Sequence, residues 1–215
     1  DLAPDVGYIR SIAFNSQGHI FAGSSPTGVF RSLEGTNWIN MALPGSKVQI
    51  IRIKNNDHVF VGTDSALFRS TNNGSNWTRL TVGISPFNVG NLYTAGNGDI
   101  YAGSSTSGFF FSTDNGDTWA SAGSPVNKGN VLLRDKSGTL YAYHFGGLYR
   151  STDNGSSWQE KADGISGLTI NSFVSLANST VLAATSRGVV RSLDQGQSWS
   201  LSTSGNSHGT NALAK

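Results

Sequence analysis

The stretch RSTDNGSSW (150–158) decides the fold, because close variants of it occur at four other places in the chain. These variants are RSLEGTNW (31–38), RSTNNGSNW (69–77), FSTDNGDTW (111–119) and RSLDQGQSW (191–199). Each phrase ends in a tryptophan, so all five tryptophans of the chain lie in them, at positions 38, 77, 119, 158 and 199. A phrase that recurs about every 40 residues indicates a repeat protein.

Two further phrases recur upstream of each tryptophan phrase and complete the repeat. The nearer one contains two short apolar runs around a turn, as in HVFVGTDSALF (58–68) and DIYAGSSTSGFF (99–110). The farther one is a single apolar run, as in VQIIRI (48–53). Turns rich in Gly and Asn separate the runs, as in AGNG (95–98) and DKSG (135–138). Each repeat therefore predicts a four-stranded antiparallel sheet.

The composition agrees with a protein made of strands and tight turns. The 215 residues include 27 Gly, only one Met, and only two Glu, Glu34 and Glu160. Charged residues are 13% of the chain and hydrophobic residues are 37%, which excludes a disordered chain and argues against a helical bundle. No apolar run is long enough to span a bilayer.

Five such sheets predict an all-β fold, a β-propeller, because one four-stranded sheet cannot bury both of its faces alone. We expect the propeller over residues 1–203, with blades of about 7–43, 44–84, 85–124, 125–165 and 166–203. Residues 204–215 are expected to form a C-terminal tail. The ring closes through this tail, another chain or further blades; if another chain is needed, the protein is an oligomer.

The tryptophan phrases resemble the Asp-box, or BNR repeat, whose pattern is S-x-D-x-G-x-S/T-W. Full matches are STDNGDTW (112–119), STDNGSSW (151–158) and SLDQGQSW (192–199). The second phrase has Asn72 and Asn76 at two motif positions, and the first phrase is one residue short, with Glu34. The resemblance implies a β-propeller similar to photosystem II assembly-factor-like and sialidase-like repeat proteins, with these boxes as the turns between third and fourth strands.

In such a box the Asp accepts backbone N–H bonds, the Gly supplies a positive φ, and the Trp packs its apolar face. We therefore expect a structural role, and largely buried tryptophans, for the box residues Glu34, Trp38, Asn72, Gly74, Trp77, Asp114, Gly116, Trp119, Asp153, Gly155, Trp158, Asp194, Gly196 and Trp199. The alternative, a calcium loop, lacks the carboxylates and the bidentate Glu. The arginines that precede the boxes, Arg31, Arg69, Arg150 and Arg191, occupy the same place in each repeat, which favours packing over a sialidase arginine triad.

Catalytic machinery is not evident in the sequence. On the face opposite the boxes the acidic residues are Asp64 and Asp163, which lie in different blades and do not form the carboxylate pair of a glycosidase. The chain has no Cys, and only His144 of its four histidines stands in a loop of that face. We therefore predict a non-enzymatic protein without cofactor or metal.

The predicted function is a binding or interaction module for a carbohydrate or a protein partner, held on the loops opposite the boxes. These loops differ most between repeats and contain the candidate ligand-binding residues Asp64, Phe87, Lys128, His144, Phe145 and Arg187. The alternatives are a propeller related to sialidase-like glycoside hydrolases, or part of a larger propeller that acts as an assembly scaffold. Scattered basic residues exclude nucleic-acid binding, and no membrane insertion is expected. A secreted, periplasmic or cell-surface location is favoured, with a lectin-like role among the options.

Overall fold

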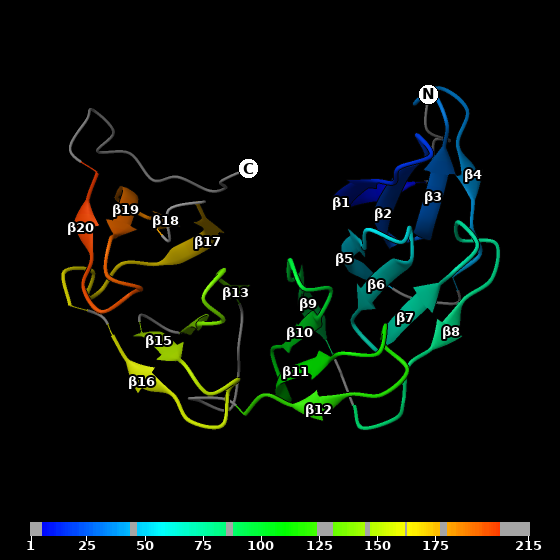
Figure 1. The fold of residues 1–215 in the computed structure, drawn as a ribbon. Coiled ribbons are helices and arrows are strands. Elements are labelled where there is room, and N and C mark those ends of the chain that lie inside the picture. The colour runs from blue at the N-terminus through cyan, green and yellow to red at the C-terminus, as the bar shows by residue number, and fades with distance from the viewer. Residues whose placement is uncertain are drawn as a thin grey trace. The chain divides into compact units, whose positions relative to one another are not determined.

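The computed structural model describes residues 6–43, 47–84, 88–123, 131–144, 147–161, 163–176 and 180–202, without the side chains of 131, 132 and 144. These residues form twenty strands and no helix (Figure 1). The strands form five antiparallel sheets of four strands each, and every sheet keeps its strands in chain order. The prediction of five four-stranded antiparallel sheets is confirmed.

The first three sheets use residues 7–121. The first sheet contains β1 (Gly7–Phe14), β2 (Ile20–Pro26), β3 (Gly28–Ser32) and β4 (Ile39–Asn40). The second contains β5 (Val48–Ile53), β6 (Val59–Thr63), β7 (Leu67–Ser70) and β8 (Thr78–Arg79). The third contains β9 (Val89–Thr94), β10 (Ile100–Ser104), β11 (Gly108–Ser112) and β12 (Ala120–Ser121).

The last two sheets use residues 131–201. The fourth contains β13 (Val131–Arg134), β14 (Leu140–His144), β15 (Gly147–Ser151) and β16 (Gln159–Glu160). The fifth contains β17 (Ile170–Ser175), β18 (Val181–Thr185), β19 (Gly188–Ser192) and β20 (Ser200–Leu201). The fourth strand of every sheet is only two residues long.

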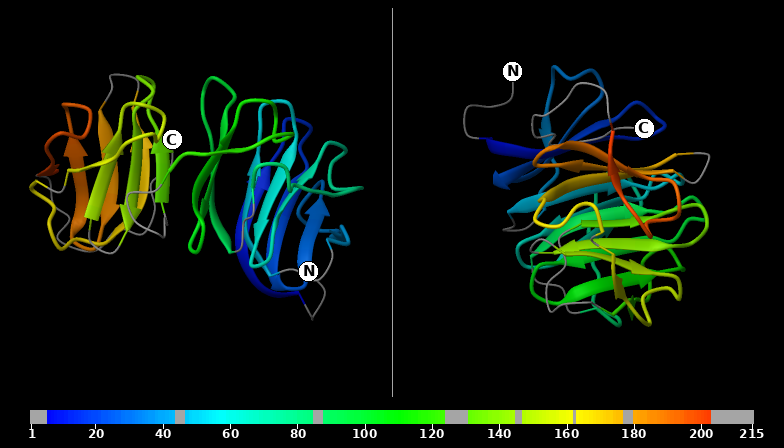
Figure 2. Two further views of the ribbon diagram at one scale, coloured as in Figure 1. Left: turned by 90° about the horizontal axis from the view of Figure 1, so that it is seen from below. Right: turned by 90° about the vertical axis from the view of Figure 1, so that its left-hand side faces the viewer.

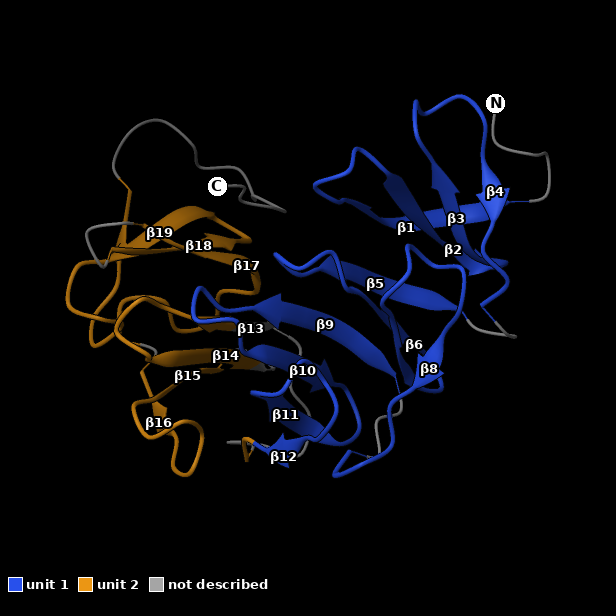
Figure 3. Cartoon of the chain, turned by 45° about the vertical axis from the view of Figure 1, so that its right-hand side comes forward, with its two compact units in different colours: residues 1–121 blue, residues 122–215 orange. Residues whose placement is uncertain are grey.

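The chain divides into two compact units, residues 1–121 and 122–215 (Figure 3). In unit 1 the first three sheets lie side by side in chain order, with β5 against β1 and β9 against β5 (Figures 1 and 2). In unit 2 the fourth and fifth sheets pack in the same way, with β17 against β13. Each unit is therefore a stack of neighbouring sheets.

Apolar side chains between neighbouring sheets form the core of unit 1. Ile51 of β5 and Leu92 of β9 stand at equivalent register positions and are fully buried. Ile51 belongs to a cluster that joins the first and second sheets, and Leu92 belongs to one that joins the second and third. Burial of both faces by neighbouring sheets is the stabilisation that a single four-stranded sheet lacks.

The five turns between third and fourth strands, at residues 32–38, 70–77, 112–119, 151–158 and 192–199, are called here the repeat turns. In the last four, the hydroxyl of the first Ser accepts the N–H of the Gly, as between Ser112 and Gly116 at 2.7 Å. Asp114 accepts the N–H of Thr118 at 2.9 Å and its hydroxyl at 2.5 Å, and Asp153 and Asp194 repeat this arrangement. Side chains thus satisfy the backbone inside each turn.

Two repeat-turn glycines are required by close packing as well as by their positive φ. Gly116 has φ +88°, and a Cβ there would lie 2.8 Å from the Phe60 ring of the preceding sheet. Gly196 has φ +78°, and a Cβ there would lie 2.3 Å from the Tyr141 ring. Any larger residue would both strain the turn and separate two sheets.

The tryptophans of the repeat turns are buried to different degrees, a difference that the prediction of five largely buried tryptophans did not include. Trp119 and Trp199 are each 5% exposed, whereas Trp38, Trp77 and Trp158 are only partly buried. Trp199 packs edge-on against Tyr141 and lies beside Phe173, and Trp119 joins the apolar cluster around Phe60. The two-residue fourth strand does not cover an indole by itself, so burial depends on what the neighbouring sheet supplies.

Candidate functional site

The loops that join second to third strands are built around a buried hydroxyl. Thr63, Ser104 and Thr185 end the second strands of their sheets, Ser24 takes the equivalent register position in β2, and all four are at most 1% exposed. The hydroxyl of Thr63 accepts the N–H groups of Ser65 and Ala66, and Ser104 and Thr185 make similar bonds in their own loops. The hydroxyl therefore fixes the loop from inside and leaves the loop's other side chains outside.

These hydroxyl residues were not singled out from the sequence, although the repeat contains a signal for them. The aligned second strands end in Ser or Thr in four repeats, and only the fourth repeat has His144 there. Backbone bonds then connect the loops of unit 1 from sheet to sheet. Asp64 donates its N–H to Lys47, Asn88 donates to Asp64, and Ser105 donates to Asn88. The loop ends of the second and third sheets thus form one continuous surface.

Asp64 is the predicted binding residue that the structure describes in unit 1. It lies in the loop between β6 and β7 and is partly exposed, but its Oδ1 is buried and accepts no hydrogen bond from the described residues. An acceptor of this kind is uncommon, because most buried polar atoms have a partner. Asp64 therefore has an acceptor without a described donor in the loop that joins β6 to β7.

Unit 2 contains the other predicted residues that can be placed. Arg187 is exposed in the loop between β18 and β19, and its N–H donates to the hydroxyl of Thr185 at 3.1 Å. His144 ends β14 and pairs with Gly147. His144 and Arg187 therefore belong to equivalent loops of neighbouring sheets. Phe87, Lys128 and Phe145 lie outside the described residues.

Asp163 was expected on the same face as these loops, and the structure places it elsewhere. Its carbonyl accepts the N–H of Trp199 at 3.2 Å, at the end of the fifth repeat turn. The loop of Arg187 is instead joined to Thr169, which accepts the N–H of Ser186 at 2.9 Å. The chain between the sheets thus passes the repeat turn before it reaches the loop surface, which sequence spacing alone did not show.

Tyr8 is an exposed aromatic residue at the loop surface that the sequence analysis did not single out. It is 83% exposed and pairs with Ser25 where β1 meets the loop after β2. A groove of about 260 Å³ lies elsewhere on the first sheet, lined by Arg31, Leu33, Glu34 and neighbouring residues of the first repeat turn. The carboxylate of Glu34 makes no hydrogen bond with the described residues, and its backbone N–H donates to the hydroxyl of Ser32.

Three aspartates of the repeat turns have their carboxylates occupied with hydrogen bonds inside the turn. The hydroxyl and N–H of Thr118 lower the pKa of Asp114 to about 2, and Ser157 and Ser198 do the same for Asp153 and Asp194. Burial lowers the pKa of His58, and the positive charges of Arg69 and Lys54 lower it further. No group of three or more His, Asp or Glu residues that could hold a metal ion occurs within the described part of the chain.

The repeated arginines also have structural partners. Arg31 and Arg69 donate to the carbonyls of Asn73 and Asn115, each at 2.7 Å, in the repeat turn of the following sheet. Arg150 does the same with Gln195 at 2.7 Å in unit 2. In the third sheet Phe111 takes the arginine position and stacks on Tyr101, with ring centroids 6.0 Å apart.

Sheets of this topology, stacked in chain order and joined by such turns, define a β-propeller domain. Residues 3–133 match the model of the DUF6242 β-propeller domain, and the chain belongs to this family. No curated protein matches the chain. Within the described residues no helix is long and apolar enough to cross a membrane.

Solved structures of the same fold include proteins of different kinds. One is YCF48 bound to D1 peptide, at 19% identity and a TM-score of 0.71, over 91% of this chain and 67% of that one. YCF48 from Cyanidioschyzon merolae matches at 13% identity and a TM-score of 0.67, over 92% and 71% of the two chains. The Niastella koreensis GH74 enzyme matches at 17% identity and a TM-score of 0.67, over 90% of this chain and 37% of that one.

Proposed function

We propose that this chain is a non-catalytic binding module that holds a protein partner on the loops between second and third strands. The observation that carries the proposal is the acceptor Oδ1 of Asp64, which receives no hydrogen bond from any residue that the structure describes and lies in a loop of unit 1. A main-chain N–H or a cationic side chain of a peptide would satisfy this acceptor. In unit 2, taken by itself, the exposed Arg187 offers a donor suited to a carboxylate or a carbonyl oxygen.

Two further points support a peptide ligand. The loops are held from inside by Thr63, Ser104 and Thr185, so they are rigid before a partner arrives, which lowers the entropic cost of binding. A neighbour with the same fold, YCF48, has been solved with a bound D1 peptide. A carbohydrate is the second candidate, because the exposed ring of Tyr8 is of the kind that stacks on a sugar.

An array of overlapping peptides from the proteome of the native source, run beside a glycan array, tests the proposal. We expect peptide binders whose affinity, measured by calorimetry, falls at least about tenfold in Asp64→Ala or Arg187→Ala. Asp99→Ala, in the hairpin at the opposite end of the third sheet, and Arg191→Ala, an exposed arginine on the same sheet as Arg187, are the matched controls and should leave the affinity unchanged. Glycan binders without peptide binders, or peptide affinity lost only in the controls, would refute the proposal.

A further inference from the structure

One row of residues crosses each sheet and contains the repeated arginine. In the fourth sheet strand pairing aligns Leu133, Tyr141 and Arg150, and in the fifth it aligns Val174, Leu182 and Arg191. The equivalent rows include Phe21 with Arg31 in the first sheet and Phe60 with Arg69 in the second. We call this line of residues the arginine row.

At three junctions within the two units, the arginine row contacts the repeat turn of the next sheet. Arg31, Arg69 and Arg150 each donate to a turn carbonyl at 2.7 Å. The acceptors Asn73, Asn115 and Gln195 are the turn residues at positive φ, between 57° and 63°. At two of these junctions the aromatic residue of the row lies under the turn glycine, Phe60 under Gly116 and Tyr141 under Gly196. At the first junction, Met41 is the residue of the first repeat that lies nearest to Gly74. The row and the eight-residue turn therefore fit together as one repeated interface.

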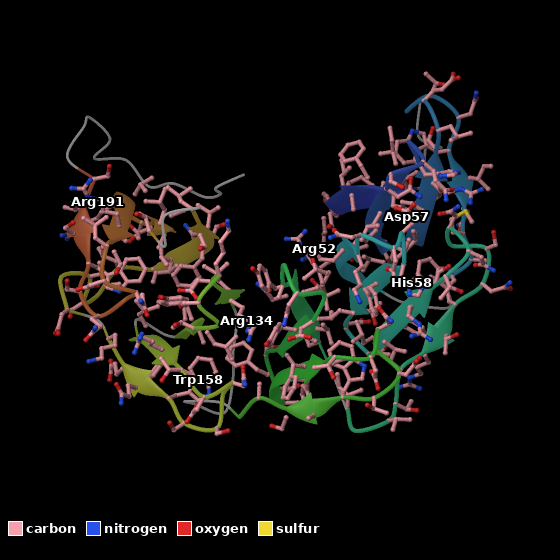
Figure 4. The ribbon with its side chains drawn as sticks, in the orientation of Figure 1. Arg52, Asp57, His58, Arg134, Trp158 and Arg191 are labelled. Atoms are coloured by element: carbon pink, nitrogen blue, oxygen red, sulfur yellow. The ribbon has the colours of Figure 1, made fainter. Side chains whose placement is uncertain are left out.

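The arginine row of the fifth sheet also has an apolar residue beside an arginine, but these two residues are less buried than their equivalents in the other rows. Phe21, Phe60 and Tyr141 are fully buried in their rows, whereas Leu182 is only partly buried. Arg31, Arg69 and Arg150 are partly buried, whereas Arg191 is exposed. Arg191 makes no hydrogen bond or ion pair with any residue that the structure describes, and Figure 4 shows it beside β20.

We propose that the arginine row of the fifth sheet is a docking face for a further four-stranded blade of the same repeat, joined in sequence. The partner is specified by the three junctions already formed: Arg191 requires a backbone carbonyl on a residue at positive φ, and Leu182 requires a glycine above it. A hydrogen bond from an arginine to a carbonyl stabilises the folded protein more inside a closed interface than at the surface, because the interface excludes competing water.

The length of the turn excludes a different occupant. The first repeat turn, SLEGTNW (32–38), lacks the residue that stands at positive φ before the Gly in the other four turns. A second copy of this chain that presented its first sheet would therefore offer no acceptor equivalent to Asn73 or Gln195. The occupant of the fifth sheet's row is thus a blade with the full eight-residue turn.

A duplicated blade tests this docking face directly. Register places Leu201 where Glu160 and Asn40 stand in their sheets, so residues 1–201 followed by 161–215 add a copy of the fifth sheet in its natural frame. A second protein adds residues 41–80 after residue 201 instead. In each extended protein the original Arg191, called here the inner Arg191, is replaced by Ala. This variant is compared with Arg191→Ala in the unmodified chain. In the first extended protein it is also compared with Arg191→Ala in the added copy of the fifth sheet.

We expect inner Arg191→Ala to lower the melting temperature of the extended protein by roughly 3–8 °C, and the other two changes to leave it unaltered. Deleting Gln195 from the added copy, which recreates the length of the first turn, should abolish the effect of the inner change. Slowed exchange of the inner Arg191 side-chain N–H protons, measured by NMR, should accompany the bond.

Four outcomes would overturn the proposal. Added blades that stay unfolded in both extended proteins, or an inner Arg191→Ala without effect in folded ones, would show that the face does not receive a blade. Destabilisation of the unmodified chain by Arg191→Ala would show that something other than a further blade already covers the arginine row of the fifth sheet. If sedimentation shows association, that occupant is a second copy of the chain. If sedimentation shows a monomer, it is another segment of the same chain.

Discussion

At the scale of single residues, the repeat turns show that two motif positions vary together. Asp114 accepts the backbone N–H of Thr118 with one oxygen and its hydroxyl with the other. In the second turn both positions change: Asn72 still accepts the N–H of Asn76 at 2.9 Å, and residue 76 has no hydroxyl to donate. An amide has only one acceptor oxygen, so Asn at the first position fits a turn without the second bond.

The same hydrogen bonds predict how the chain responds to acid. Because the folded pKa of Asp114, Asp153 and Asp194 lies at about 2, below the ordinary value of 3.8, these groups stabilise the folded chain when ionised. Their contribution is complete above about pH 4 and is lost as the pH falls towards 2. We expect urea midpoints, followed by circular dichroism, to fall across that range.

A variant with the natural pattern of the second turn is the control for this prediction. This variant has Asn at both motif positions of three turns. The replaced residues are Asp114, Asp153 and Asp194, together with Thr118, Ser157 and Ser198. The change removes the three titrating carboxyl groups and keeps the side-chain bond to the backbone N–H in each turn. Its stability should depend less steeply on pH between 4 and 2 than that of the natural chain. Equal slopes would mean that these carboxylates are not hydrogen-bonded in solution.

At the scale of strands and turns, the sequence predicts the secondary-structure elements well because the same pattern of apolar runs and turns occurs in every repeat. Five copies of one pattern indicate which apolar runs pair and where the turns lie, as with β10 and β11 around Ser104. Burial of the tryptophans is not predictable in this way. Trp38 and Trp119 occupy the same motif position, but the neighbouring sheet covers only Trp119, and this neighbour is not part of the motif.

The candidate binding residues illustrate the same limit. Asp64 and Arg187 are in the loops where the sequence predicts them, since loop position follows from strand order. The buried hydroxyl of Thr63 depends on side-chain geometry, which the repeat pattern does not encode, and so does the lack of a donor to Asp64 Oδ1 among the described residues. Asp163 was misplaced because the path of the chain between two sheets is not part of the repeat.

Paired substitutions in unit 1 test the difference in tryptophan burial. Trp119→Ala should lower the free energy of unfolding by about 3–5 kcal/mol, because it removes a buried indole from the cluster around Phe60. Trp38→Ala should cost roughly 1–2 kcal/mol, because part of that indole is already exposed to water. Urea denaturation followed by circular dichroism measures both, and equal costs would contradict the burial seen here.

At the scale of the whole molecule, the chemistry of the carboxylates bears on whether the chain is an enzyme. Members of this fold include a GH74 enzyme as well as YCF48, so the fold does not decide the question. A glycosidase requires an acid whose pKa is raised until it can donate a proton near neutral pH. The described carboxyl groups with shifted pKa values, Asp57, Asp114, Asp153 and Asp194, all have lowered ones.

We therefore expect purified protein to show no hydrolysis of sialosides or β-glucans above the buffer rate. Asp64 and Asp163 are separate groups, because Asp64 lies in the loop between β6 and β7 and the carbonyl of Asp163 accepts the N–H of Trp199. Release of a fluorogenic aglycone and of reducing ends, at high protein concentration, measures the two reactions. Turnover that disappears in Asp64→Asn or Asp163→Asn, and persists in Asp99→Asn, would show that one of these carboxylates is catalytic and that the binding-module proposal is incomplete.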